Sequence, residues 1–314
     1  MMDKDIILSV CIPTYNGGNR IEKCLDALAV SFGKLTDVEV VVSDNGSTDN
    51  TSAILENYSK IGNYKVYHNQ ENLGFNENIR LLIDQYAKGK YCWIIGDDDY
   101  IDPDAIERVR EILLDKKPEF ISVRHRVLSE NDFQNFSVDA SRVIETQSAS
   151  YFKCIDLNAS SSNVLGTFMS SQIFLLEPVK CFDKSIFGDN NWNNFKEVFP
   201  NSYMMTMLFY DKEDCCCIKT PLITALSHPK SWDDKLYMIW TRILPDYYHY
   251  CFTLTSYKEL LSRTYYIITY KKTLLYLKAF LSFQFSIVNW RYIFSYQFIR
   301  GLSLVCIKKF WRKN

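Results

Sequence analysis

The sequence predicts an α/β protein with a mostly parallel, Rossmann-like sheet, helices on both faces and a C-terminal helical, amphipathic tail. Between residues 6 and 123, short β-branched and apolar runs alternate with amphipathic helical segments, which is typical of parallel strands joined by crossover helices. The 314 residues are 47% hydrophobic and 23% charged. This composition excludes disordered and low-complexity chains.

The first half of the chain supplies the strands and helices in regular alternation. Residues 6–12 form an apolar, β-rich run that stops at Pro13 and a cluster of turn residues, and apolar positions at helical spacing follow from Ile21. The next strands are expected at residues 38–42, 64–68, 91–95 and 119–123, and the helices at 21–29, 47–58, 76–87 and 102–114. Asp102 is expected to cap the last of these helices.

Beyond residue 123 the alternation weakens. Residues 166–180 are expected to form a pair of strands, and residues 184–196 a polar loop rich in Asn and Trp. A short helix is expected at residues 201–211. The spacing of apolar residues from about residue 236 onward indicates further helices.

Charge is unevenly distributed along the chain. The formal net charge is −1, which gives no reason to expect nucleic acid as a partner, but residues 258–314 carry eleven Lys or Arg and one acid. The longest uncharged stretch after Lys271, residues 279–290, is too short to span a bilayer, which needs about 20 apolar residues. The tail is expected either to pack as amphipathic helices or to bind an anionic membrane surface, and Phe310 and Trp311 among basic residues favour the membrane.

The expected location is cytoplasmic, peripheral on the inner face of the cell membrane. The ten cysteines include no CxxC pair, and the first residues lack the pattern of a signal peptide. Both observations favour a reducing compartment.

Polar residues follow two neighbouring strands at the edge where open α/β sheets bind ligands. Asp44 could accept hydrogen bonds from a base or a ribose, while a capped turn is the alternative interpretation of its surroundings. The residues at the two strand ends are Pro13, Thr14, Tyr15 and Asn16 for the first, and Asp44, Asn45 and Ser47 for the second.

Three consecutive carboxylates, Asp97, Asp98 and Asp99, follow the expected strand 91–95. Such a cluster repels itself unless a cation offsets its charge. Hard oxygen ligands that leave room for substrate phosphates select Mg²⁺ or Mn²⁺. An acidic helix cap is the alternative, and it is disfavoured because Asp102 is expected to fill that role.

Four motifs together resemble those of the inverting glycosyltransferases of family 2, which have the GT-A fold. The motifs are SVCIPTYN, VVVSDNGSTDNT, NQENLGFNENI and YCWIIGDDDYIDPDAI, and they cover residues 6 to about 125. The resemblance implies transfer of a sugar from a nucleotide-diphosphate donor to an acceptor hydroxyl, assisted by a divalent metal. The residues implied at the donor site are Pro13, Thr14, Tyr15, Asn16, Asp44, Asn45, Ser47, Asn72, Gly74, Asn78 and Asp97.

One position departs from the family pattern. The usual motif is Asp-x-Asp-Asp, and alignment on Tyr100 places Gly96 where the first Asp would stand. Asp98 and Asp99 then match best as metal ligands, while Asp97 either supplies the missing carboxylate by a small shift or the ribose contact is absent. The glycine version resembles the abequosyltransferase-type branch of O-antigen synthesis. This implies a lipid-linked glycan acceptor, with a UDP-sugar as the commonest donor.

The catalytic base is less clearly marked. Many relatives carry a Glu-Asp pair before a helix, but here residues 196–201 read KEVFPN. Glu197 and Asp189 are the candidates for accepting the hydroxyl proton. Solvated loop acids are the alternative interpretation of both.

The histidines are interpreted by position. His228, in SHPKSW, resembles a His-x-x-Ser segment of several relatives and is expected to be a metal ligand, with a structural role as the alternative. His68 and His125 lie in expected strands and are interpreted as core or edge residues.

The expected division is a nucleotide-sugar-binding half in residues 1–125, an acceptor-binding half in 126–235 and a membrane-associating region in 236–314. Two rival functions are considered. A nucleotidyltransferase is expected to show a glycine-rich, basic phosphate loop, which residues 17–20 (GGNR) match poorly. A catalytically impaired sugar-nucleotide or glycan-binding module is suggested by the missing Glu-Asp pair.

Overall fold

The structure, a computed structural model, describes most of the first 227 residues and one later helix. The described residues are 5–139, 141–158, 166–187, 194–227 and 243–254, with Met238, Ile239 and Thr273. The chain divides into two compact units, one of residues 1–158 with 166–228 and the other of residues 159–165 with 229–314. The first unit contains the sheet, and helix α11 (Leu244–Leu254) belongs to the second.

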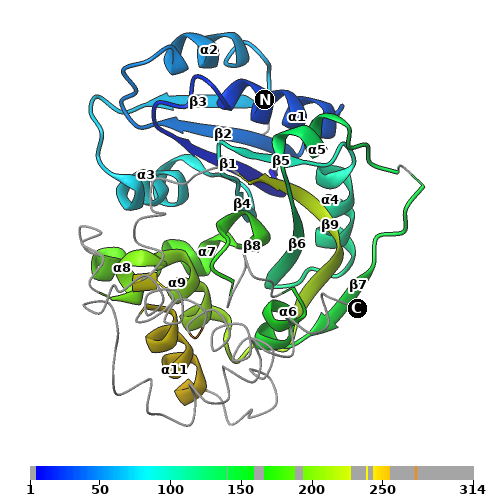
Figure 1. The fold of residues 1–314 in the computed structure, drawn as a ribbon, viewed down its shortest axis with the longest axis vertical. Helices are drawn as coiled ribbons and strands as arrows, with labels where there is room; N and C mark the ends of the chain where they lie inside the picture. Colours follow the sequence, from blue (N-terminus) through cyan, green and yellow to red (C-terminus); the bar gives the residue numbers. More distant parts are fainter. Residues whose placement is uncertain are drawn as a thin grey trace. The chain divides into compact units, whose positions relative to one another are not determined.

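A single sheet organises the first unit (Figure 1). Its strand order is β3-β2-β1-β4-β8-β6-β9-β5, with β7 also paired to β9. The strands are β1 (Leu8–Thr14), β2 (Val38–Asp44), β3 (Tyr64–His68), β4 (Tyr91–Ile94), β5 (Asp99–Ile101), β6 (Phe120–Leu128), β7 (Thr146–Ala149), β8 (Gln172–Leu175) and β9 (Cys215–Leu226).

The sheet is parallel in its first half and mixed in its second. Strands β3, β2, β1 and β4 all run parallel, as the alternation of strands and helices predicts. Strand β8 is antiparallel to both β4 and β6, whereas β6 and β9 are parallel. The predicted parallel arrangement is therefore confirmed for the half that carries the strand-end motifs.

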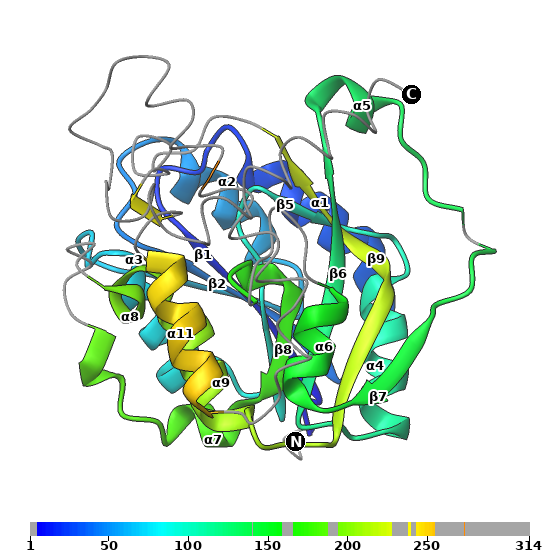
Figure 2. The ribbon, with the colours of Figure 1, turned by 60° about the horizontal axis from the view of Figure 1, so that its bottom comes forward.

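Helices cover both faces of the sheet, as expected, and Figure 2 shows them from a second direction. Helices α1 and α4 contribute to the core on one face, while α3 and the π-helical turn η1 contact β1 and β2. The helices are α1 (Ile21–Phe32), α2 (Thr51–Tyr58), α3 (Phe75–Leu81), η1 (Leu82–Tyr86), α4 (Ala105–Asp115), α5 (Glu130–Gln134), α6 (Tyr151–Leu157), η2 (Met169–Ser171), α7 (Leu176–Lys180), η3 (Lys184–Phe187), α8 (Phe195–Val198) and α9 (Pro200–Phe209).

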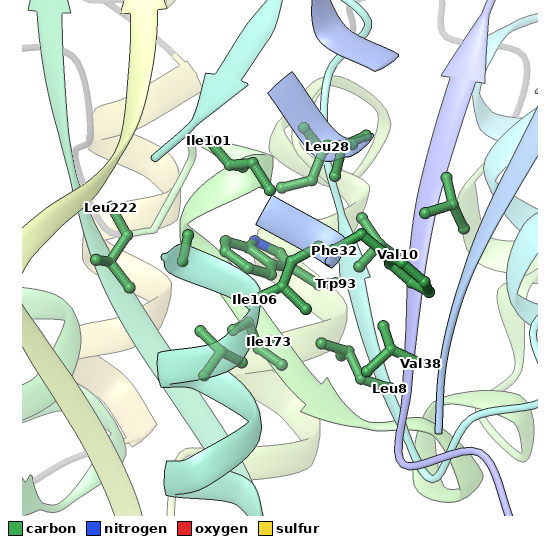
Figure 3. Packing of buried hydrophobic residues seen from close by; sticks show 14 of the residues in the cluster. Leu8, Val10, Leu28, Phe32, Val38, Trp93, Ile101, Ile106, Ile173 and Leu222 are labelled. Carbon is green, nitrogen blue, oxygen red and sulfur yellow. The ribbon is translucent and has the colours of Figure 1, made fainter. Parts of the chain in front are cut away.

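Trp93 lies at the centre of the core (Figure 3). Its side chain is fully buried, and Phe32 of α1, Ile106 of α4 and Ile173 of β8 belong to the same cluster. Because alternate residues of a strand point to the same face, the apolar run of β1 can supply this core and also be buried on its other face. This packing holds β4 in place, and the three aspartates follow shortly after β4 in the chain.

Residues 166–180 contain one strand, so the predicted strand pair is wrong. Strand β8 ends at Leu175, and α7 begins at Leu176. Pro178 explains the change, because proline has no N–H to give to a strand ladder but is tolerated in the first turn of a helix.

Two further predictions need correction. The segment expected as the polar loop 184–196 contains η3 and the start of α8, whose N-cap Asn194 accepts hydrogen bonds from two backbone N–H groups. Asp102 does not cap α4. Asp104 stands at the N-cap position, and the buried carboxylate of Asp102 pairs with Arg126 and Arg142.

Within the described residues, no helix is both long enough and apolar enough to cross a membrane. Most of the basic tail lies outside those residues, so its expected helices and its membrane contact stay predictions.

Candidate active site

The ends of β1, β2 and β4 bring the predicted residues together at one edge of the sheet. Pro13 and Thr14 pair in register with Ser43 and Asp44, because the two strands are parallel. The hydroxyl of Thr14 donates a 2.6 Å hydrogen bond to Oδ2 of Asp97, which follows β4. Three segments far apart in the sequence therefore meet at this edge, as expected.

Asp97 is held by Arg20, the residue before α1. Nε of Arg20 lies 2.8 Å from Oδ1 of Asp97 and Nη2 lies 2.9 Å from Oδ2, which is a bidentate ion pair. Burial lowers the pKa of Arg20, but the hydrogen bonds and charge of Asp97 outweigh it, and the net shift is upward. Both oxygens of Asp97 are thus already bound by protein groups.

Arg20 also holds the turn that follows β1. Its guanidinium donates to the carbonyl oxygens of Tyr15 and Asn16, at 3.2 and 3.1 Å. Asn16 has a φ of +48°, a left-handed conformation that asparagine tolerates better than most residues. The Tyr15 side chain at this turn is 40% exposed, so an aromatic ring is presented at the edge of the site.

Asn16 and Ser47 join the turn after β1 to the loop after β2. The backbone N–H of Asn16 donates to the hydroxyl of Ser47 at 2.9 Å, and Oδ1 of Asn16 accepts from the N–H of Thr48 at 2.9 Å. Asn16 and Ser47, both predicted at the donor site, therefore hold the two loops together through hydrogen bonds within the protein.

Asp44 is buried at the end of β2 and accepts several hydrogen bonds. Its donors are the N–H of Ser47 at 3.1 Å, the hydroxyl of Ser52 at 2.6 Å and Nδ1 of His68 at 3.0 Å. Burial raises the pKa of Asp44, but these hydrogen bonds outweigh it and lower the pKa below the ordinary range. Asp44 is therefore a charged hydrogen-bond acceptor, held in a fixed position at this edge of the sheet.

Asn45 fastens the loop of residues 69–74 to the end of β2. Its Oδ1 accepts from the side chain of Asn69 and the N–H of Leu73, at 3.0 and 3.1 Å. Its Nδ2 donates to Oδ1 of Asn72 at 2.9 Å and to the carbonyl of Gly74 at 3.2 Å. Asn72 and Gly74 thus lie together beside the end of β2.

Asn78 is buried under this loop. Ser43 donates to its Oδ1 at 2.6 Å, and its Nδ2 donates to the carbonyl of Ser43 at 3.1 Å. Asn78, at 2% exposure, therefore joins α3 to the end of β2.

Ser170 links Asp99 to the strand that precedes the aspartates. Its hydroxyl donates to Oδ2 of Asp99 and accepts from the N–H of Gly96 at 3.0 Å, while its carbonyl accepts from Nε1 of Trp93 at 2.7 Å. A Cβ at position 96 would lie 2.9 Å from Oδ2 of Asp99 and 3.0 Å from Oδ1 of Asp98. Glycine at this position therefore leaves room for the carboxylates of Asp98 and Asp99.

Asp98 and Asp99 are the candidates to hold a cation together with a diphosphate, because an oxygen of each lies beside Gly96. In the part of the chain that the structure covers, no group of three or more His, Cys, Asp or Glu side chains forms a metal site. Asp98 and Asp99 are consecutive acids, and Mg²⁺ or Mn²⁺ is commonly held by one or two carboxylates with substrate phosphates completing the shell. The third expected ligand, His228, lies outside the described residues.

Asp189 and Glu197 are the two candidates for the catalytic base. Asp189 lies outside the described residues. Glu197 is on α8, and its Oε1 accepts a 2.7 Å hydrogen bond from the side chain of Asn194, the N-cap of the same helix. Its role as a base stays a prediction.

The histidines of the two strands lie as expected, His68 on the edge strand β3 and His125 buried in β6. Nδ1 of His125 lies 3.1 Å from the hydroxyl of Ser171, and its ring packs on Phe168 with centroids 4.1 Å apart. Burial, reinforced by Arg124, lowers the pKa of His125 to about 4. It is therefore neutral at pH 7.

The contributions of Arg20, Ser52, His68 and Ser170 to this edge were missed by reasoning from the sequence. Arg20 and Asp97 are 77 positions apart, and Ser170 and Asp99 are 71 apart. No local pattern marks such pairs. The sequence did offer one signal for Arg20, because this residue directly follows the turn residues Gly17, Gly18 and Asn19.

Comparison with known proteins identifies the family. The model described as "Glycosyl transferase family 2" matches residues 9–173, more than half of the chain. The chain belongs to this family.

Curated relatives of this family 2 chain include abequosyltransferase RfbV of Salmonella typhimurium, 33% identical over 103 residues. Another is the poly(ribitol-phosphate) beta-N-acetylglucosaminyltransferase TarS of Staphylococcus aureus, 35% identical over 99 residues. Each alignment covers 32% of this chain. It spans 31% of RfbV and 17% of TarS, so the matched part is a fraction of each relative.

Solved structures show the GT-A fold for this chain. TarS 1-349 in complex with UDP-GlcNAc superposes with a TM-score of 0.57 at 18% identity, covering 95% of this chain and 80% of that one. The mannosyltransferase PcManGT from Pyrobaculum calidifontis, in complex with GDP-Man and Mn²⁺, gives 0.54 at 15% identity, with coverages of 99% and 89%.

Proposed function

We propose that this chain is a glycosyltransferase that moves a sugar from a nucleotide-diphosphate donor to a hydroxyl of a glycan acceptor. The observation that carries the proposal is the meeting of Thr14, Asp44 and the aspartates at one edge of a sheet in a family 2 chain. The acceptor oxygen attacks the anomeric carbon opposite the diphosphate. The bond from that carbon to the diphosphate oxygen breaks, and the configuration inverts.

The donor would lie along the loops that this edge holds in place. Tyr15 offers an exposed ring to the base, and the fixed carboxylate of Asp44 can accept hydrogen bonds from the base or ribose. Asn72 and Gly74, which Asn45 holds beside the end of β2, would form one wall of the donor pocket. Since Arg20 binds both oxygens of Asp97, that carboxylate serves to position the turn after β1.

Asp98 and Asp99 would hold Mn²⁺ or Mg²⁺ beside the diphosphate. When bound, the cation would offset the charge that develops on the departing nucleoside diphosphate. Ser170 keeps Asp99 oriented through its hydrogen bond. His228 is proposed as a further ligand.

Proton transfer from the acceptor requires a base on the second half of the domain. Glu197 and Asp189 are the proposed candidates. The proposed division remains residues 1–125 for the donor, 126–235 for the acceptor and 236–314 for membrane association.

The substrates are proposed from the relatives and from the charge of the chain. RfbV is by its name an abequosyltransferase, and the resemblance of the glycine-containing aspartate motif to that branch supports a lipid-linked glycan acceptor in surface polysaccharide synthesis. The UDP-GlcNAc bound to TarS supports a UDP-sugar donor. The basic tail supports peripheral binding to the anionic inner face of the cell membrane. A catalytically impaired binding module is the second candidate, favoured by the missing Glu-Asp pair.

Thermal unfolding of the purified chain with UDP, GDP, CDP and dTDP, each with and without Mn²⁺, tests the donor site. One nucleotide should stabilise the chain in a metal-dependent way, by about 2.7 kcal/mol at a concentration about 100-fold above Kd. Asp98→Ala should abolish the metal dependence, and Asp115→Ala, an exposed acid on α4, should preserve it.

The outcomes separate the two functions. Stabilisation followed by release of the nucleoside diphosphate from a sugar donor in the presence of acceptor supports the enzyme. Stabilisation without turnover supports the impaired module. No stabilisation by any of the four nucleotides would contradict the donor site itself.

A further inference from the structure

Strand β5 carries one of the two proposed metal ligands but is only three residues long. Asp99 is its first residue, and the strand pairs antiparallel with β9, where Asp99 stands opposite Ala225 and Ile101 opposite Ile223. It lies at one end of the strand order, so β9 is its only strand neighbour among the described residues. Three residues form few ladder hydrogen bonds. The position of β5 therefore depends on what holds its ends.

A buried ion pair holds the end of β5. Asp102 directly follows the strand and is 3% exposed. Its two carboxylate oxygens accept from the guanidinium of Arg126, from Nη1 at 2.6 Å and from Nη2 at 2.9 Å. The backbone N–H of Asp102 also donates to the carbonyl of Leu222 in β9, at 2.9 Å. Bidentate pairs of this kind add geometric specificity as well as energy, so the chain is fixed three positions after Asp99.

The same guanidinium also binds β9. Arg126 belongs to β6, and its Nη1 donates to the hydroxyl of Thr224 at 3.0 Å, while Nη2 donates to the carbonyl of Pro221 at 2.6 Å. Thr224 stands opposite Tyr100 of β5 in the ladder. Figure 1 shows β5, β9 and β6 beside one another. One arginine therefore joins β6 and β9 to the residue that ends β5.

The segment after β6 contacts β5 and the same carboxylate. Arg142 lies between α5 and β7, and its Nη2 lies 3.0 Å from Oδ2 of Asp102 and 2.5 Å from Oδ1 of Asp104. The ring of Phe133 in α5 packs on that of Tyr100, with centroids 4.5 Å apart. Asp102 therefore keeps a second arginine if the contact with the first is weakened.

We propose that Arg126 and Asp102 are positioning residues for the metal, because they set where β5 presents Asp98 and Asp99 to a cation and a diphosphate. The inference rests on the proposed function. Side chains that support metal ligands typically contribute about 10- to 100-fold to metal affinity. Buried ion pairs add little stability compared with apolar residues of the same volume, so a pair retained at this place is better explained by the geometry it imposes.

The proposal gives Asp99 two supports that act on different atoms. Ser170 holds its carboxylate through a hydrogen bond. The ion pair acts on its backbone, through the short strand that Asp99 begins. Metal ligands need to be held within about 0.5 Å of the productive geometry. A small shift of β5 is therefore expected to weaken metal binding without unfolding the sheet.

Arg126→Lys tests the positioning role. Lysine keeps the positive charge but lacks the planar fork, so it cannot bind both oxygens of Asp102 and the two groups of β9 at once. Because Arg142 still binds Asp102, the variant should fold, and its thermal midpoint checks this. Asp102→Glu is the second variant, since it keeps the charge and moves the carboxylate by one methylene.

Titration calorimetry gives the Kd for Mn²⁺ in the full chain, saturated with whichever of UDP, GDP, CDP or dTDP binds to it. We expect each variant to raise this Kd by at least about tenfold. A matching increase in the Mn²⁺ concentration should then restore nucleotide binding. Such rescue would not follow if the substitution had only unfolded part of the chain.

Arg110→Lys is the matched control. Arg110 of α4 forms a similar pair with Asp37, with Nε 2.8 Å from both carboxylate oxygens. Asp37 precedes β2, at the opposite edge of the sheet from the aspartates. This substitution should also lower the thermal midpoint but leave the Kd for Mn²⁺ within about twofold of the native value, as expected for distant sites.

The outcomes separate this inference from the proposed function. An unchanged Kd for Mn²⁺ in Arg126→Lys, or an equal rise in Arg110→Lys, would overturn the inference and leave the proposed metal site intact. Loss of nucleotide binding that added Mn²⁺ does not restore would also overturn it, because the ion pair would then be purely structural. Failure of the native chain to bind Mn²⁺ with any of the four nucleotides would contradict the proposed function and the inference together.

Discussion

Among the three aspartates, Asp97 has a carboxylate that is bound by an arginine. Arg20 contacts both oxygens of Asp97 and two carbonyls of the turn after β1. The ion pair therefore joins the end of β4 to the start of α1. The ion pair with Arg20 therefore gives Asp97 a structural role that does not require a metal ion.

Removing the arginine should leave the carboxylate of Asp97 poorly compensated. The Arg20 side chain is 34% exposed, so solvent weakens the pair, and we expect Arg20→Ala to lower the free energy of unfolding by about 1–2 kcal/mol. Lysine cannot form the bidentate contact, so Arg20→Lys should recover only part of the loss. Urea unfolding measures both.

A double-mutant cycle isolates this pair. Asp97→Ala in the Arg20→Ala background should cost less than Asp97→Ala alone, because its main partner is already gone. Additive losses would contradict the pairing. Asp97→Ala should also keep metal-dependent nucleotide binding, whereas Asp98→Ala should lose it.

At the scale of elements, the turn between β2 and α2 depends on a glycine. Gly46 has a φ of +71°, and a Cβ there would lie 2.6 Å from the backbone carbon of Glu71. Both the backbone conformation and the contact disfavour any side chain. We expect Gly46→Ala to destabilise the fold by at least about 1–2 kcal/mol in urea unfolding.

Gly62 provides the control for this substitution. A Cβ at position 62 meets nothing within 4 Å, so Gly62→Ala should change stability by less than about 0.5 kcal/mol. Equal losses of stability at the two positions would show that the contact between Gly46 and the backbone of residues 71–72 does not set the cost of a side chain at position 46.

Strand β6 carries a histidine that links folding to pH. In the unfolded chain a histidine titrates near 6.5, whereas burial lowers the pKa of His125 to about 4. Between these values the unfolded chain binds a proton that the folded chain does not, so stability falls as the pH falls. The loss between pH 7 and pH 5 should be about 2 kcal/mol from this residue.

The comparison with His125→Gln tests this linkage. Urea unfolding of the variant at pH 7, 6 and 5 should show a shallower dependence on pH, because glutamine does not titrate. Parallel curves for the two proteins would contradict the assignment to His125.

Most elements were predictable because their signals are local. The apolar runs of β1, β2 and β4 end at turn residues, and parallel strands place those ends at one edge. Strand β8 was harder, since Leu175 and Leu176 belong to different elements and Pro178 decides the boundary. The partners of Asp97 and Asp99 required the fold itself, because Arg20 and Ser170 come from distant parts of the sequence.

At the scale of the whole molecule, the charge is divided between an acidic first part and a basic tail. Each basic residue near an anionic membrane surface contributes about 1 kcal/mol to binding. Replacing four basic residues near the C-terminus by glutamine should therefore weaken sedimentation with phosphatidylglycerol vesicles by at least about tenfold. The four are Lys308, Lys309, Arg312 and Lys313.

A control variant with the same change in net charge, made outside the tail, tests whether the position of the basic residues matters for membrane binding. Glutamine at four exposed lysines of the first unit should leave vesicle binding nearly unchanged. They are Lys23, Lys34, Lys60 and Lys65. Equal losses from the two variants would contradict a specific role for the tail, as would equal binding to neutral phosphatidylcholine vesicles.

The hydrogen bond from Trp93 to Ser170 connects a fluorescent side chain to the aspartates. The indole of Trp93 is shielded from water, and its N–H donates to the carbonyl of the residue whose hydroxyl binds Asp99. A rearrangement of Asp99 is therefore transmitted through one serine to a fluorophore. The difference in emission between the native chain and Trp93→Phe isolates this signal from those of the other tryptophans. Stopped-flow fluorescence can follow events at the aspartates in real time, without a label.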